Sequence, residues 1–250
     1  MNVLILGTGD AFSRRSFGSS ALVQAPDGYI LLDCPDPIHR VIHEATTKHN
    51  WNVDAGAIDD IIVTHLHGDH SNGLESFGFH RRIAAMQNPG AHPKRPRLHA
   101  TQPVLDRLWE KLAPAMDSPM GGSRPSQLAD YFEVNLLTPG TVARIAGVNV
   151  SCRFTRHPIP TIGLKIAAGS RVLGWSGDTA FEQEHIDWLS DADVIVHESN
   201  LGAAHTSLDA LEALPEALRK RLRLIHTPDD LKPEATTLHV LTDRELLMFE

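Results

Sequence analysis

The stretch THLHGDH at 64–70 gathers three histidines and one aspartate within a single short segment. It directly follows an apolar run that we expect to form a buried strand. Imidazole nitrogens and carboxylate oxygens are good ligands for first-row metal ions. His65 and His67 can approach one point from a loop, whereas the adjacent Asp69 and His70 point in different directions and suit a second point. The stretch therefore predicts ligands for two metal ions, but too few to complete both sites.

Three further candidate ligands each follow an apolar run elsewhere in the chain: His157, Asp178 and His226. One such residue alone is more often a cap or a surface group. Together with the histidine-rich stretch, however, they complete a set of seven. Asp178 is the natural bridging candidate, because a carboxylate can contact two cations and a neutral imidazole cannot.

Short apolar runs and turn residues alternate along the whole chain. Eight runs have the length and composition of strands: 3–6, 29–33, 60–64, 148–154, 162–167, 171–175, 193–198 and 221–226. Three segments have helical spacing: 37–49, 104–116 and 207–222, the last with Ser207 as a candidate N-cap. This succession predicts an α/β fold, with α+β as the alternative, in a single domain that covers residues 1–250.

The composition restricts the classes of protein that the chain can represent. Of its 250 residues, 42% are hydrophobic and 22% are charged, and the formal net charge is −8. This acidity argues against an extended nucleic-acid surface, which needs clustered Lys and Arg. The two cysteines form no disulfide framework, the N-terminus lacks the pattern of a secretory signal, and no apolar run has the length of a membrane span. We therefore expect a cytoplasmic protein with no membrane partner.

The order in which these residues occur resembles the metallo-β-lactamase superfamily, over the span from Asp33 to His226. The resemblance implies an αββα sandwich with a dinuclear metal site at one edge. It assigns the first metal to His65, His67 and His157, the second metal to Asp69, His70 and His226, and the bridging position to Asp178. Asp33, in LLDCP, matches the aspartate that orients the histidine loop from behind.

The resemblance narrows to the ribonuclease Z branch and, equally, to its shorter relative, the phosphodiesterase of the carbon–phosphorus lyase pathway. The stretches that carry it are GTGDAFSRRSFGSSALVQ (7–24), THLHGDH, HPIPTIGL (157–164), VHES (196–199) and AHTSLDAL (204–211). It implies that Glu198 and His205 assist catalysis. The match at His205 is imperfect, because the ribonuclease pattern is His-Ser-Thr and here Thr206 and Ser207 follow.

The same resemblance bears on the size of the substrate. Ribonuclease Z carries a long basic arm between the third motif and the bridging aspartate, and it grips tRNA with that arm. Here only twenty residues separate His157 from Asp178, which leaves no room for the arm. The short spacing and the negative net charge argue against tRNA and favour a small phosphodiester.

The expected activity is therefore that of a dinuclear phosphodiesterase. Two divalent cations about 3.5–4 Å apart would hold a bridging hydroxide as the nucleophile and draw off charge at phosphorus. Zn and Mn fit the ligand set, and Fe is a further option. His205, oriented by Glu198, is the candidate general acid, and Asp69 could assist proton transfer.

Two alternatives stand beside the phosphodiesterase. A lactonase or thioesterase of the same superfamily would use the same hydroxide on an acyl substrate and would not need His205. A metal-binding sensor or structural protein would hold the metals without turnover. Substrate contacts from Arg14, Arg15 or the irregular loops 87–97 and 116–127 are left open, and a homodimer is the default oligomeric state.

Overall fold

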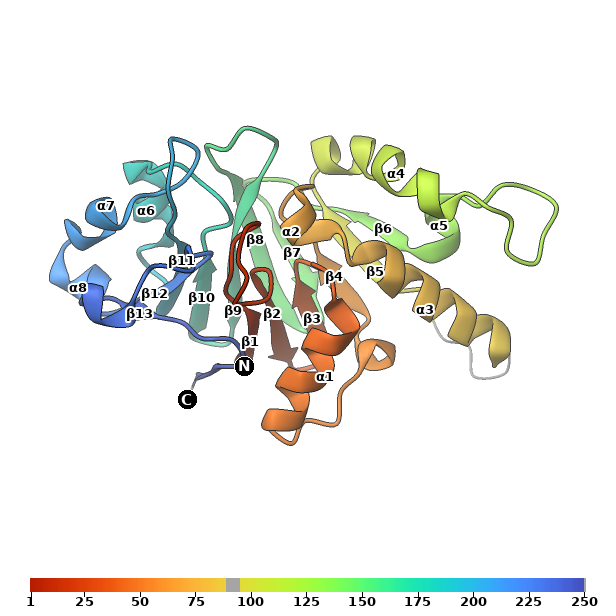
Figure 1. The fold of residues 1–250 in the computed structure, drawn as a ribbon, viewed down its shortest axis with the longest axis horizontal. Helices are drawn as coiled ribbons and strands as arrows, with labels where there is room; N and C mark the ends of the chain where they lie inside the picture. The colour runs from red at the N-terminus through yellow and green to blue at the C-terminus, as the bar shows by residue number, and fades with distance from the viewer. Residues whose placement is uncertain (89–94, 250) are drawn as a thin grey trace.

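The computed structural model describes residues 1–88 and 95–249, which form two seven-stranded sheets packed face to face (Figure 1). The first sheet contains β1 (Asn2–Gly7), β2 (Ser20–Ala25), β3 (Gly28–Leu32), β4 (Asp60–Ile62), β5 (Arg97–Ala100), β6 (Glu133–Leu136) and β14 (Leu246–Met248). The second sheet contains β7 (Val142–Ile145), β8 (Val148–Phe154), β9 (Ile162–Ala168), β10 (Arg171–Trp175), β11 (Val194–Glu198), β12 (Leu222–Ile225) and β13 (His239–Val240).

The two sheets repeat one pattern of strand pairing. In the first sheet the order is β14-β1-β2-β3-β4-β5-β6, and the pairs are antiparallel as far as β3 and parallel from β3 onward. In the second sheet the order is β7-β8-β9-β10-β11-β12-β13, antiparallel as far as β10 and parallel from there. Each sheet therefore has a parallel half, and the carboxyl ends of parallel strands are common places for binding sites.

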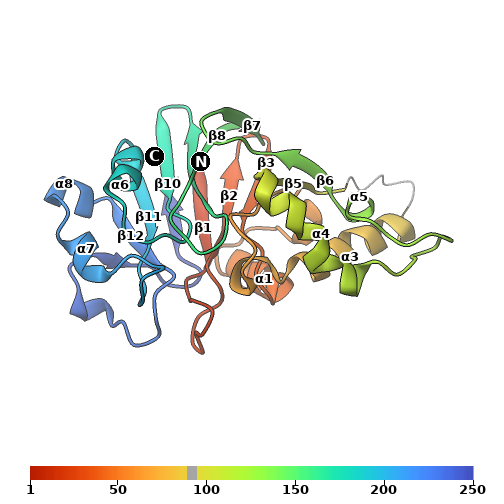
Figure 2. The same cartoon turned by 90° about the horizontal axis from the view of Figure 1, so that it is seen from above.

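Helices cover the outer face of each sheet (Figure 2). The first sheet packs against α1 (Ile38–Lys48), α3 (Leu74–Gln87) and α4 (Gln102–Met116), and the second against α6 (Gln183–Leu189), α7 (Leu208–Glu212) and α8 (Glu216–Arg219). The short helices α2 (Gly68–Ser71) and α5 (Leu128–Tyr131) and the 3-10 turns Ala55–Ala57 and Pro233–Ala235 lie in the connections. The layers are αββα, so both the expected α/β fold and the sandwich architecture are confirmed. None of the described helices is long and apolar enough to cross a membrane.

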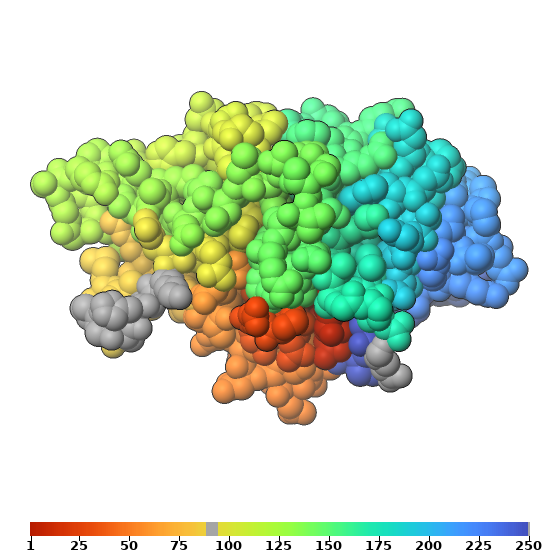
Figure 3. All heavy atoms as spheres, turned by 180° about the vertical axis from the view of Figure 1, so that it is seen from behind, coloured from red at the N-terminus to blue at the C-terminus, as the bar shows by residue number. Residues whose placement is uncertain are grey.

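The core explains why the strand sequences are apolar at nearly every position. In β1, Leu4 and Leu6 pack beneath the helices, while Val3 and Ile5 pack between the two sheets. Alternate side chains of a strand point to opposite faces, so a strand with both faces buried needs a continuous apolar run. Seen from behind, the first residues of the chain, in red, reach the surface only in a small area below the centre, bordered by later segments (Figure 3).

All eight predicted strands are present, with ends that differ by at most two residues. The single helix expected at 207–222 is wrong, because α7 and α8 divide that segment and β12 begins within it. Pro215 causes the break, since it has no backbone N–H to continue α7 and instead precedes the first turn of α8. The predicted cap at Ser207 is confirmed by its side chain, which accepts a hydrogen bond from the Ala210 backbone N–H at 3.3 Å.

Two buried histidines in the second half make stability depend on pH. His197 of β11 pairs its Nδ1 with the Glu198 carbonyl oxygen at 2.7 Å, and His185 of α6 pairs its Nε2 with the Ser176 carbonyl oxygen at 3.1 Å. Burial lowers the pKa of His197 to about 4 and, with the nearby His197 ring, that of His185 to about 3. Both rings are therefore neutral in the folded protein at pH 5, where the unfolded chain would protonate them.

We expect the free energy of unfolding to fall as pH drops below about 6.5, the pKa of an unfolded histidine, because only the unfolded state then gains protons. At pH 5 each of the two rings should lower the free energy of unfolding by about 2 kcal/mol relative to its value at neutral pH. His197→Asn keeps a donor near the Nδ1 position but cannot titrate, so it should remove its share of the loss. Urea unfolding at pH 7 and pH 5 measures this, with the exposed His43→Asn as the matched control. Equal pH dependence of His197→Asn and wild type would contradict the assignment.

Candidate metal centre

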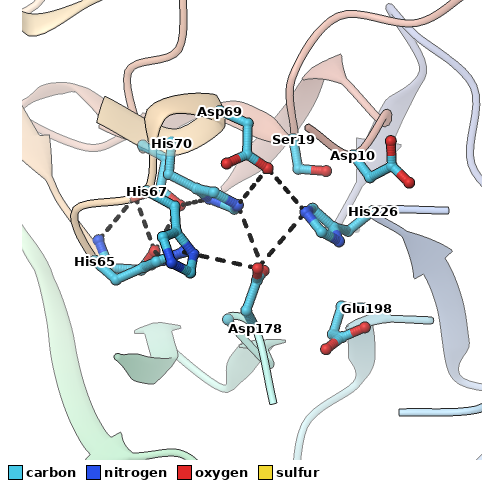
Figure 4. A network of polar contacts seen from close by, with 12 residues as sticks. Asp10, Ser19, His65, His67, Asp69, His70, Asp178, Glu198 and His226 are labelled. Carbon is cyan, nitrogen blue, oxygen red and sulfur yellow. Dashed lines mark hydrogen bonds and ion pairs between the residues drawn. The ribbon is translucent and has the colours of Figure 1, made fainter. Parts of the chain in front are cut away.

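The seven predicted ligands lie together at one edge of the sandwich, on segments that leave the ends of strands. All of them except His157 are labelled in Figure 4. The first sheet supplies the histidine-rich stretch after β4, where His67 precedes α2 and the first turn of that helix carries Asp69. The second sheet supplies the other three, from the segments after β8, β10 and β12: His157, Asp178 and His226. The structure thus brings the seven candidate ligands together.

Three imidazoles form the first group. Nδ1 of His67 lies 3.1 Å from Nε2 of His65 and 3.1 Å from Nε2 of His157. In His157, Nδ1 is the donor nitrogen, since it faces the Ala204 carbonyl oxygen at 3.2 Å. In His65, Nδ1 faces the Thr64 hydroxyl at 3.0 Å. Because that hydroxyl donates its hydrogen to Asp33, it accepts a hydrogen bond from Nδ1 of His65. Both Nε2 atoms are therefore left with lone pairs that converge on one point.

The second group contains one carboxylate and two imidazoles. Oδ2 of Asp69 lies 3.1 Å from Nε2 of His226 and 3.4 Å from Nε2 of His70. Nε2 of His70 is buried and has no hydrogen-bond partner among the described residues. Burying a nitrogen without a partner costs free energy of folding unless a ligand binds it. Nε2 of His70 is therefore a candidate ligand for a metal ion.

Asp178 lies between the two groups, buried, and faces both of them. Its Oδ2 is 3.7 Å from Nε2 of His65 and 3.6 Å from Nε2 of His226, and its Oδ1 is 3.5 Å from Nε2 of His70. Two nitrogen ligands of one tetrahedral zinc ion, each about 2.0–2.1 Å from it, would be about 3.4 Å apart. The distances between ligand atoms within the two groups, and from those groups to Asp178, are 3.1–3.9 Å and bracket that spacing. The donor set and its geometry fit a pair of divalent cations.

Asp33 lies behind the histidine-rich stretch and is fully buried. Its Oδ2 accepts a hydrogen bond from Nδ1 of His70 at 2.8 Å, and its Oδ1 accepts one from the Thr64 backbone N–H at 2.7 Å. The first bond leaves Nε2 of His70 free to face the carboxylates of Asp69 and Asp178. Burial raises the pKa of Asp33, although the charge of His70 and the bonds from His70 and Thr64 act in the opposite direction.

Asp33→Asn is expected to weaken binding of the metal that His70 would hold by about 10- to 100-fold, because the neutral amide orients and polarises the imidazole less well. Competition against a metal-binding dye measures the affinity. The matched control is Asp36→Asn, an exposed aspartate of the same segment. Unchanged affinity in Asp33→Asn would contradict the positioning role.

A second ionisable pair lies beside the cluster. Nδ1 of His205 donates to Oε1 of Glu198 at 3.0 Å, and the same oxygen accepts the Thr179 backbone N–H at 2.8 Å. The His205 ring stacks on the His226 ring, with centroids 5.3 Å apart. His205 could also form a metal-binding group with Asp178 and His226. The geometry therefore allows two roles for His205, as a proton donor or as an additional ligand.

The charges in the site stabilise one another. Burial raises the pKa of Asp178, but the surrounding histidines, above all His70 and His226, outweigh it and hold that pKa well below its usual range. The pKa of Asp69 is also held well below its usual range against burial, by the hydrogen bond from His226 and the nearby charge of His70. The bond to Glu198 raises the pKa of His205. The two aspartates are therefore anionic, as metal ligands must be.

Two residues beside the site were not predicted from the sequence. Asn200 donates from its amide nitrogen to Oδ2 of Asp10 at 2.8 Å and to the His226 carbonyl oxygen at 3.0 Å. Asn200, Asp10 and His226 come from three distant segments, so no local spacing in the sequence predicts these contacts. The only sequence signal was position, since Asn200 directly follows VHES and Asp10 lies in GTGDAF.

A cavity of about 820 Å³ opens beside the cluster, lined among others by Arg14, Asp69, Asp178, His205 and His226. Arg14, a possible substrate contact from the sequence, lines this cavity. Residues 116–127 do not line it. Part of the other loop, 89–94, lies outside the described residues, so the structure does not address it.

The fold and the site define a metal-binding hydrolase of the metallo-β-lactamase superfamily. The family model of the anti-Pycsar protein Apyc1 matches residues 1–242, and the chain belongs to that family. A relative named anti-Pycsar protein Apyc1, from Saccharibacillus brassicae, is 30% identical over 237 residues, 92% of this chain and 91% of the relative.

Solved structures resemble the chain in fold. The metallo-β-lactamase fold protein YhfI from Bacillus subtilis has a TM-score of 0.78 and 15% identity, and the match covers 98% of each chain. A diphosphatase of the PhnP family has a TM-score of 0.74 and 18% identity, over 100% of this chain and 98% of the other. At these identities, the similarity supports the fold alone.

Proposed function

We propose that this protein is a phosphodiesterase with two metal ions that hydrolyses cyclic nucleotides, the signal molecules of the Pycsar system to which the family name refers. The proposal rests above all on the Glu198–His205 pair, which lies beside a seven-residue ligand cluster in a member of the Apyc1 family. A cyclic nucleotide is an internal phosphodiester, which agrees with the small substrate expected from the sequence.

We assign one metal to His65, His67 and His157, the other to Asp69, His70 and His226, and the bridging position to Asp178. Bound there, two divalent cations would lower the pKa of water and offset the negative charge that develops at phosphorus. Zn and Mn suit this donor set, and Fe also accepts it.

The protein's own residues would handle the leaving oxygen. Glu198 fixes Nδ1 of His205 by a hydrogen bond, so the other ring nitrogen, Nε2, is the one available to a substrate in the cavity. From there His205 would donate a proton to the ribose oxygen as its bond to phosphorus breaks. Glu198 acts as the positioning residue, since it contacts His205 and the Thr179 backbone rather than the substrate.

Phosphate recognition would fall to the metals and to Arg14. Arg14 lines the cavity, and its backbone N–H bonds to Asp229, which fixes the segment that presents the side chain. A guanidinium group can contact two phosphate oxygens at once. The homodimer and the cytoplasmic localisation stay predictions from the sequence.

The test is a substrate panel with purified protein supplied with Zn or Mn. We expect hydrolysis of cyclic nucleotides to nucleoside monophosphates, and little or no turnover of lactones and thioesters. Turnover of the acyl substrates alone would favour the lactonase or thioesterase alternative. Two bound metals per chain without turnover of any panel member would favour a metal-binding protein that is not an enzyme.

A further inference from the structure

Two exposed apolar side chains lie at the cavity beside the metal centre. Among the large hydrophobic residues that the structure describes, Phe12 is the most exposed, at 87%, and Leu201 is next, at 74%. Both line the cavity that contains Asp69, Asp178 and His226. Single exposed hydrophobic residues are ordinary on protein surfaces, but two from distant segments at one functional cavity are not explained in that way.

The segment that carries Phe12 is anchored at its base and beyond its tip. The carboxylate of Asp243 accepts hydrogen bonds from the Thr8 backbone N–H at 3.0 Å and from the Phe17 backbone N–H at 3.0 Å. Beyond the tip, Asp229 accepts the Ser13 hydroxyl at 2.6 Å and the Arg14 backbone N–H at 2.8 Å. The tip is therefore presented by a segment that is already fixed, so little further ordering would be needed on binding.

The segment that carries Leu201 is joined to the first one. The amide nitrogen of Asn200 bonds to Oδ2 of Asp10, two residues before Phe12, and the amide oxygen of Asn200 accepts the Leu201 backbone N–H at 2.7 Å. The same amide nitrogen bonds to the carbonyl oxygen of the candidate ligand His226. These bonds fix both apolar residues relative to the metal centre.

We propose that Phe12 and Leu201 form an apolar clamp that holds the base of the nucleotide, with the Phe12 ring stacked on it, while the phosphodiester lies at the metal centre. This inference rests on the proposed function, because it requires a substrate that carries a flat ring system within reach of the cavity rim when its phosphate lies at the metal centre. A base fits that description, since each base presents a π-face to an aromatic ring whatever its polar edge.

The polar groups at this rim favour stacking over hydrogen-bond readout of the base. Asn200 uses both its amide nitrogen and its amide oxygen within the protein, and Asp10 accepts from Asn200 and from the Phe12 backbone N–H. These side chains are therefore engaged before a substrate arrives. The contribution of Phe12 should follow stacking strength, and be larger for purine than for pyrimidine cyclic nucleotides.

The experiment compares Phe12→Ala, Phe12→Trp and Leu201→Ala with wild type on purine and pyrimidine cyclic nucleotides. Stacking on one aromatic side chain is worth about 1–3 kcal/mol, and an exposed ring should give the lower end. We expect KM to rise about 5- to 10-fold in Phe12→Ala, more for purines, and about 3-fold in Leu201→Ala, with kcat nearly unchanged. Phe12→Trp should retain tight binding. Val142→Ala, at a 66% exposed residue of the β7 edge strand, is the matched control.

Two further readouts separate the clamp from general damage. Ribose cyclic phosphate, which carries no base, should show the same KM in Phe12→Ala and wild type. Calorimetric titration with nucleoside monophosphates should show the affinity loss without any turnover. Equal KM and product affinity in Phe12→Ala and wild type would overturn the clamp while leaving the proposed function intact. A wild-type protein that hydrolyses no cyclic nucleotide would overturn both.

Discussion

Replacing Asp178 by alanine is expected to abolish hydrolysis and to remove at least one of the two metal ions. Asp178 is 3% exposed and faces Nε2 of His65, His70 and His226 at 3.5–3.7 Å, so its carboxylate contacts both ligand groups. Its loss removes a negative charge from a group of histidines and leaves their nitrogens without a shared partner. Because a metal site supplies several kcal/mol of transition-state stabilisation, activity should fall at least about 10³-fold.

Metal content by mass spectrometry and turnover of cyclic nucleotides are the two measurements for Asp178→Ala. Asp178→Asn keeps the shape but not the charge, and it should lose most of the activity while retaining the fold by circular dichroism. Asp191→Ala is the control, because Asp191 makes only a surface ion pair with Lys165. Full metal content together with full activity in Asp178→Ala would refute the bridging assignment.

The second large effect is expected for His205→Ala, which should lower kcat by about 10²- to 10⁴-fold, the range for a general acid. His205 forms a hydrogen bond with Glu198 and stacks on His226, and it lines the cavity. If it donates the proton, both metals should remain in the variant, and KM should change little. The loss should also be smaller for substrates with a good leaving group such as 4-nitrophenol, which needs no proton.

Metal content separates the two roles that the geometry allows. A His205→Ala protein with one metal fewer than wild type would make His205 a ligand of the group with Asp178 and His226 rather than an acid. Glu198→Gln keeps the acceptor oxygen but removes the charge, and should give a partial loss of kcat. His239→Ala, at an exposed histidine paired with Glu245, is the matched control and should retain wild-type kcat.

The candidate ligands could be predicted because each is marked by residue type and by position. His65 and Asp178 follow apolar runs that fold as strands, and their loops meet because strand ends of both sheets lie at one edge of the sandwich. The assignment of His157 to the first metal and of His226 to the second came instead from the superfamily resemblance, since spacing alone cannot pair them with parts of the histidine-rich stretch.

Other features were beyond local pattern. Helix α3 was not predicted, because its buried face includes Arg81, which bonds to Asp59 and breaks the apolar stripe that marks an amphipathic helix. The contact of Asn200 with Asp10 joins positions 190 residues apart. The two sheets share one order of antiparallel and parallel pairs, but the sequence shows no internal repeat. The shared order concerns the direction of the strands, which residue identity does not record.

The division of the ligands between the two sheets has a consequence for how the metals leave. Neither sheet alone has a complete set, since the histidine-rich stretch belongs to one and His157, Asp178 and His226 to the other. Bound metal ions would therefore link the two sheets, and the free energy of metal binding would also stabilise the packing of one sheet against the other. The rate of metal loss to a chelator would then report how often the halves part. Substitutions in the apolar layer between the sheets, far from any ligand, should accelerate that release.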